Sequence, residues 1–135
     1  MTLTAIDTNS ILVTYFKTQS TLTDLTTTAR IYGPPGLPAD FTIQPAVSFF
    51  TSGGNSDLYV TELRSPSKTI KCWGSTPVEA RQVYRALYQV LQGIERVTVE
   101  SNIILCAEQE VEGQDLIDPD TDWPFVLTFF KVMMR

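Results

Sequence analysis

The chain has 135 residues, 43% of them hydrophobic, and a formal net charge of −5 at pH 7. This length suits one domain with its own core, and the sequence lacks both a signal peptide and the run of about eighteen apolar residues that a membrane-spanning helix needs. The acidic balance argues against the basic surface that nucleic-acid binding requires. Histidine is absent, which excludes imidazole catalysis and histidine-ligated metals.

The first third of the chain predicts one helix followed by a loop. Asp7–Ser10 offers helix caps, and the apolar residues after it recur at helical spacing, so we expect a short helix over Thr8–Gln19. The threonine-rich stretch Thr18–Thr28 favours no single element. Arg30–Tyr32 is typical of a brief extended piece, and Gly33–Pro38 of a loop, because its three prolines and two glycines break regular structure.

A strand and a long hairpin are expected next. The strand covers Ala46–Thr51 and ends at a glycine-rich turn, and Leu58–Leu63 alternates in the way that one arm of a hairpin would. We expect residues 53–67 to form a flexible arm, which is either a surface hairpin without a role or a contact with a neighbouring subunit. The candidate contact residues of the arm are Leu58, Tyr59, Val60 and Arg64.

The clearest pattern is a strand that runs directly into a helix. The strand covers Lys68–Trp73, and Gly74 ends it. Thr76 and Glu79 then form a capping box, with proline at the first helical position between them. A stripe of apolar residues at helical spacing predicts the helix Pro77–Gln92, which must be covered by a sheet.

The last third predicts two strands and an acidic loop. Val97–Val111 is expected as one long, half-buried antiparallel strand, Gly113–Asp122 as a loop, and Trp123–Met134 as the last strand. Both faces of this last strand are apolar, so the face away from the helices needs a cover from the same chain or from another subunit. The expected fold is therefore α+β: an antiparallel sheet of about four strands, with two main helices packed on it and a long hairpin.

No motif for catalysis or for cofactor binding is present. The glycine-rich turn Ser52–Ser56 lacks the lysine of a phosphate loop, and Trp123 and Phe129 stand where a calcium loop that began at Asp118 would need glycine and glutamate. Cys72 and Cys106 are expected as buried free thiols within strands. We therefore expect neither an enzyme nor a cofactor or metal site.

The acidic residues are unevenly distributed. Nine of the fifteen lie between Glu95 and Asp122, where Arg96 is the only basic residue. Glu108, Glu110 and Glu112 are expected on one solvated strand face. Such asymmetry can serve head-to-tail contact between identical subunits, or it can line a passage that repels a polyanion.

Several segments, taken in order, carry a family resemblance. The strand followed by "WG-S-T-P-x-E-A" and the later "DLxDPDT" loop are the most specific of them. Together the segments resemble the tail-terminator, or tail-completion, proteins of tailed bacteriophages, which belong to the head–tail joining group. The segments that carry the resemblance are Arg30–Pro34, Pro45–Phe49, Ile70–Ala80, Asp115–Asp122 and the closing aromatic strand.

The resemblance implies a structural role in a virion, after assembly in the host cytoplasm. Such proteins form a homohexameric ring that caps the tail tube, ends its polymerisation and presents a surface to the head-side connector or stopper protein, while genomic DNA passes through the bore. The helix Pro77–Gln92 would then form the outer layer. The candidate residues for the lumen or the ring interface are Glu108, Glu110, Glu112, Asp115, Asp118, Asp120 and Asp122.

Two other functions remain open. One is a head-completion or stopper protein, which would form a different ring of the same virion neck. The second is a small non-viral α+β binding domain. Mass in solution separates them, because a binding domain gives no reason for a six-fold ring and a stopper should bind the portal side rather than tail tubes.

Overall fold

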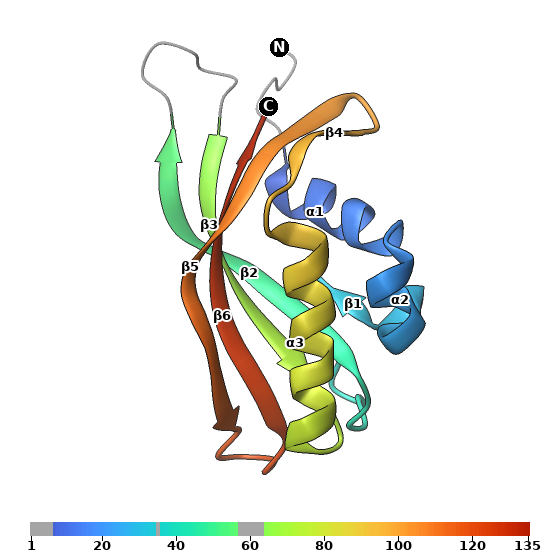
Figure 1. The fold of residues 1–135 in the computed structure, drawn as a ribbon. Coiled ribbons are helices and arrows are strands. Elements are labelled where there is room, and N and C mark those ends of the chain that lie inside the picture. The colour runs from blue at the N-terminus through green and yellow to red at the C-terminus, as the bar shows by residue number, and fades with distance from the viewer. Residues whose placement is uncertain (1–6, 35, 57–63) are drawn as a thin grey trace.

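A six-stranded sheet with helices on one face forms the fold in the computed structural model, which describes residues 7–34, 36–56 and 64–135 (Figure 1). The strand order is β1-β2-β3-β6-β5-β4; β1 is parallel to β2, and all other neighbours are antiparallel. The elements are α1 (Thr8–Lys17), α2 (Ser20–Thr26), the 3-10 turn η1 (Thr28–Arg30), β1 (Ile31–Tyr32), β2 (Ala46–Ser56), β3 (Arg64–Trp73), α3 (Pro77–Leu91), β4 (Glu95–Val99), β5 (Asn102–Ile117) and β6 (Pro124–Met134).

The α+β class is confirmed, but the sheet is larger and less regular than predicted. It has six strands instead of about four, and it is mixed because the two-residue strand β1 lies parallel to β2. The predicted single strand Val97–Val111 is wrong: a turn at Glu100–Ser101 divides it into β4 and β5. Glu100 adopts a φ of 56°, a conformation that glycine or asparagine adopts more readily, so a turn at glutamate could not be expected from the residue type.

The N-terminal helices differ from the prediction in number. The first helix ends at Lys17 rather than Gln19, and the hydroxyl of Thr18 donates to the carbonyl of Tyr15 at this end. A third α-helix, α2, lies in the stretch that favoured no element. Burial of Leu22 and Thr26 against the sheet and α3 outweighs the poor helix propensity of its threonines.

The junction between β3 and α3 is as predicted, although β3 begins at Arg64 rather than Lys68 and α3 ends at Leu91 rather than Gln92. Thr76 Oγ1 accepts from the backbone N–H of Glu79, and Glu79 Oε1 accepts from that of Ser75. Gly74 joins the two elements because nothing larger fits: a Cβ there would lie 2.3 Å from the backbone nitrogen of Ala80. The helix can therefore start directly beside the end of the strand.

The hairpin has a longer paired base than predicted. β2 continues to Ser56 and β3 begins at Arg64, so both strands extend into the predicted arm. A register shift between Thr51 and Gly54 marks a bulge, and Gly54 has φ 121°. A Cβ at Gly54 would lie 2.4 Å from the carbonyl oxygen of Ser65, so glycine is required next to Pro66 in the opposite strand. The arm residues Leu58, Tyr59 and Val60 lie outside the described residues.

Candidate functional site: the open face of the sheet and its acidic edge

The side chains of β6 point alternately to the two faces of the sheet. One face is covered by the helices and is called the covered face; the other is called the open face. Phe130 and Val132 point to the helices and are fully buried. Phe129 and Met133, their neighbours in the sequence, point the other way and are only half-buried. Cross-strand pairing places further apolar residues beside them, and the open face is defined here as Phe50, Val111, Leu116, Leu127, Phe129 and Met133.

One end of this face is covered by the chain itself. Trp73 packs against Phe125, with ring centroids 4.8 Å apart, and its indole N–H donates to Ser48 Oγ at 2.9 Å. The loop residues Leu37 and Phe41 pack over this cluster. Cover by a loop of the same chain, one of the two predicted possibilities, is therefore confirmed at this end. Over the rest of the open face, the described residues provide no covering element.

The three glutamates of β5 do not share a face, contrary to the prediction. Glu110 accepts from the hydroxyl of Ser67 on the open side, whereas Glu112 accepts from the hydroxyl of Tyr84 on the helix side. Glu108 lies opposite Lys131, which belongs to the open side. Bulges between Gln109 and Gln114 shift the alternation, so the even spacing of the glutamates does not give one acidic face.

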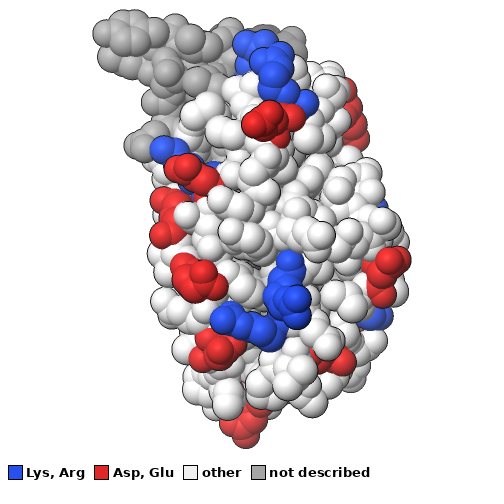
Figure 2. Space-filling view, viewed as in Figure 1, with Lys and Arg blue, Asp and Glu red and all other residues white. Residues whose placement is uncertain are grey.

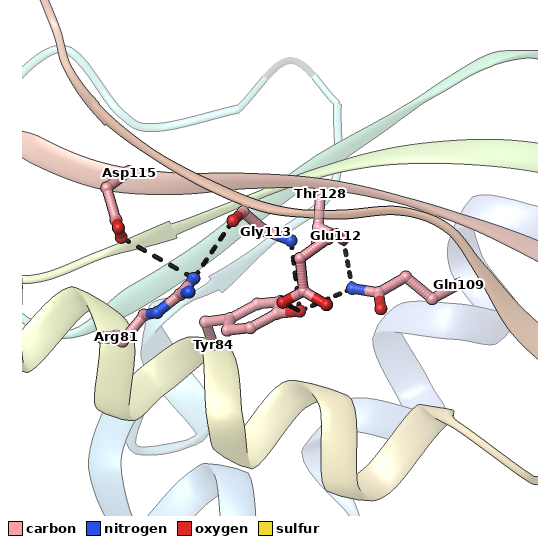
Figure 3. Close-up of polar contacts among 7 residues, drawn as sticks. All are labelled: Arg81, Tyr84, Gln109, Glu112, Gly113, Asp115 and Thr128. Carbon is pink, nitrogen blue, oxygen red and sulfur yellow. Dashed lines mark hydrogen bonds and ion pairs between the residues drawn. The ribbon is translucent and has the colours of Figure 1, made fainter.

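Tyr84 of α3 fixes this irregular part of β5 (Figure 3). Its hydroxyl donates to Glu112 at 2.8 Å and accepts from Gln109 Nε2 at 2.6 Å and from the backbone N–H of Gly113 at 3.2 Å. Burial is the main cause that raises the pKa of Tyr84. A Cβ at Gly113 would lie 2.7 Å from the tyrosine ring, so the ring needs a glycine there. Gly113 was expected to begin the acidic loop, but it lies within β5, where a glycine marks a bulge or a close approach.

The predicted acidic loop is shorter than expected. β5 continues to Ile117, so Asp115 is a strand residue, and it pairs with Arg81 at 3.7 Å. Only residues 118–123 form the loop, in which Asp118 Oδ1 accepts from the backbone N–H of Asp120. Asp120 and Asp122 are exposed there. Within the described parts of the chain, no three acidic or cysteine side chains gather closely enough to hold a metal ion.

Several acidic side chains follow one edge of the molecule and reach one of its ends. Figure 2 shows them along the side where β5 runs and at the end where the β5–β6 loop lies, with other acidic groups on the opposite side and near the other end. That end also presents two exposed apolar side chains, Val78 at the start of α3 and Ile117 at the end of β5. The structure thus places the predicted acidic residues along β5 and in the β5–β6 loop, but on both sides of the sheet.

The two cysteines have different environments. Cys72 is buried on the covered face, and burial raises the pKa of its thiol. Cys106 is free as well, but it is exposed, so the prediction of two buried thiols is wrong for this residue. A register shift between Ile104 and Cys106 explains the difference, because it turns Ile104 inward and Cys106 outward.

Comparison with known proteins gives a structural relative. No family model and no curated protein matches the sequence. Among solved structures, a chain from the virion of a native gene transfer agent particle is similar, with 14% identity and a TM-score of 0.57. The match covers 89% of this chain and 88% of that chain, so the two share a fold over nearly their whole length. No described helix is long and apolar enough to cross a membrane.

Proposed function

We propose that this chain is a structural, non-catalytic virion protein that caps the phage tail tube as a homohexameric ring, ends tail polymerisation and joins the tail to the head-side connector. The observation that carries the proposal is an apolar open face on a fold shared with a chain of a gene transfer agent virion. The resemblance of the strand–helix unit and of the acidic loop to tail terminators narrows the role within the virion.

The open face supports contact between subunits. Phe50, Val111 and Leu116 are each between 38% and 46% exposed, and they surround the half-buried side chains of β6. A patch of this kind on a virion protein favours burial against another chain. In a ring the contact is heterologous, so the open face of one subunit packs on a different surface of the next.

The acidic edge supports a passage for DNA. Glu108 and Glu110 on the open side, together with Asp120 and Asp122 at the loop, carry negative charge that repels phosphate. A bore lined with such residues lets genomic DNA slide without binding. The same residues offer a contact for a basic surface of the connector or the tube protein.

The decisive experiment measures mass by light scattering, alone and with purified tail tubes of the same virion, and observes the tubes by electron microscopy. We expect a hexamer, or a monomer that joins tube ends and halts tube growth. The Phe129→Lys variant should lose this behaviour. The Tyr88→Lys variant should keep it, because Tyr88 is exposed but lies on the helix side.

Other outcomes contradict the proposal in distinct ways. A protein that binds portal-side assemblies but ignores tubes is a stopper. A monomer that ignores both is a binding domain unrelated to the neck. If Phe129→Lys caps tubes as well as the unmodified protein does, the open face is not the subunit contact, although the capping role stands.

A further inference from the structure

A lysine is completely buried beneath the first turn of α1. Lys68 lies on the covered face of β3, and its side chain has no exposed area. Its ammonium group donates to Thr8 Oγ1 at 2.9 Å, Asn9 Oδ1 at 2.7 Å and Thr51 Oγ1 at 2.7 Å. All three donors of the ammonium are therefore used, and each acceptor is a neutral oxygen.

These contacts join two parts of the fold that are far apart in sequence. Thr8 and Asn9 form the first turn of α1, whereas Thr51 and Lys68 lie on the paired strands at the base of the β2–β3 hairpin. Thr51 also donates directly to Asn9 Oδ1 at 2.9 Å. The residue after Thr51 begins the bulge that leads to Gly54. The lysine thus holds a helix start against the base of the hairpin.

The surroundings disfavour a buried positive charge. The charged group that acts on Lys68 is Asp7, which is exposed and already accepts from the backbone N–H groups of Asn9 and Ser10. The β2 segment Ala46–Gly54 contributes no titratable side chain, and the residue opposite Lys68 on β6 is Phe130. The N-terminus of α1 adds the positive end of a helix dipole. Burial lowers the pKa of Lys68 to about 8, and the charge of Asp7 offsets this only in part.

We propose that Lys68 is a latch: it holds the first turn of α1 against the base of the hairpin, and its protonation state sets how often that turn opens. When the turn opens, water reaches the ammonium and relieves the cost of its burial. The neutral amine has little such cost, so the closed form is favoured once the proton is lost. This inference does not depend on the proposed virion role.

The direction of the pH effect follows from linkage. The open form keeps an ordinary lysine, with a pKa near 10.4, whereas the closed form releases its proton near pH 8. The open form therefore binds more protons above pH 8, and the opening equilibrium constant falls as pH rises. With these two values it falls about tenfold between pH 7 and pH 9. Tyr15, on the same helix, does not titrate in this window, because burial raises the pKa of its hydroxyl above the ordinary value of about 10.

Hydrogen exchange of the α1 amides tests the latch. The amides of Asn9, Ser10 and Ile11 all bond to Asp7, so they report opening of the first turn. After correction for the intrinsic exchange rate, we expect their opening constant to fall about tenfold from pH 7 to pH 9. The Lys68→Met variant should show no such fall. The Lys71→Met variant, which changes a lysine on the same strand but on the opposite face, should keep it.

A second variant keeps the test decisive if Lys68→Met does not fold. Asn9→Asp places a carboxylate where the amide oxygen now accepts, which raises the pKa of Lys68 and moves the change in opening above pH 9. The decrease in the opening constant between pH 7 and pH 9 should then be at least severalfold smaller than in the unmodified protein. An opening constant in the unmodified protein that is the same at both pH values overturns the latch, and so does a tenfold fall that persists in Lys68→Met or in Asn9→Asp.

Discussion

The two faces of the sheet are built from the same strands but differ in what covers them. On the covered face, Ile70 and Phe130 pack beneath the helices and have no exposed area. On the open face, Phe129 and Met133 are only half-buried, and no helix or strand in the described part of the chain covers them. Consecutive residues of β6 therefore have different roles. The covered face holds the monomer together, whereas the open face provides apolar area for a partner.

The largest expected effect is a difference in stability between alanine substitutions at two neighbouring phenylalanines. Phe130→Ala should lower the free energy of unfolding by about 3–5 kcal/mol, because it leaves a cavity in the core. Phe129→Ala should lower it by only about 1 kcal/mol, because the ring is half-buried. Urea denaturation of the two variants measures the difference. Equal losses would show that the open face is part of the core of the monomer.

A smaller loss is expected where the covered face meets α3. Gly74→Ala places a methyl group 2.3 Å from the backbone of Ala80 and should cost about 1–3 kcal/mol, because the start of the helix must shift. Gly33→Ala is the matched control: Gly33 also lies in a connecting segment and, like Gly74, has no positive φ, but the added atom would meet only side chains, the nearest being a methyl group of Val13 at 3.2 Å. Thermal unfolding that ranks the control as the more damaging change would contradict the close-approach argument.

The hydroxyl of Tyr84 should contribute less than the glycine contact. Tyr84→Phe removes one donated and two accepted hydrogen bonds at the bulges of β5 and should cost about 1–2 kcal/mol. Tyr88→Phe on the same helix is the control, because the ring of Tyr88 is substantially exposed. Hydrogen exchange around Gln109–Gly113 should increase only in the first variant. Unchanged exchange there would show that the bulges hold without Tyr84.

The smallest effect on folding is expected at the acidic edge. Reversing Glu108 and Glu110 to lysine should change the free energy of unfolding by less than about 1 kcal/mol, because both are exposed. In assembled rings, the same change should cause DNA to be retained at low salt. Reversing Glu112 alone should not, because its carboxylate faces α3. Equal retention by both variants would place the helix side, too, on the DNA path.

The elements that could be predicted from the sequence are those that local rules determine. Helix α3 carries its own cap, its own proline at the first position and a regular apolar stripe, so its limits needed no tertiary information. The same holds for β3 near Trp73, and for the two-faced apolar pattern of β6. The conclusion that one face of β6 needs a cover followed from this pattern alone.

The elements that could not be predicted depend on contacts between distant residues. The bulges of β5 are set by Tyr84 and Gly113, so the alternation of Glu108, Glu110 and Glu112 gave the wrong face for Glu112. From the sequence alone, Lys68 is expected to be an ordinary polar residue of a strand. Its burial requires oxygens from α1 and from β2, and no local pattern brings these together.

The contrast between the two cysteines provides a built-in reporter of assembly. Cys106 pairs across the sheet with Met133 at the margin of the open face, and it is accessible, whereas Cys72 is closed to reagents. A thiol-reactive fluorophore should therefore label one position without any engineered substitution. Covering of the open face by another chain would slow this labelling or alter the emission of a dye already attached. The native sequence thus allows the association to be followed in real time.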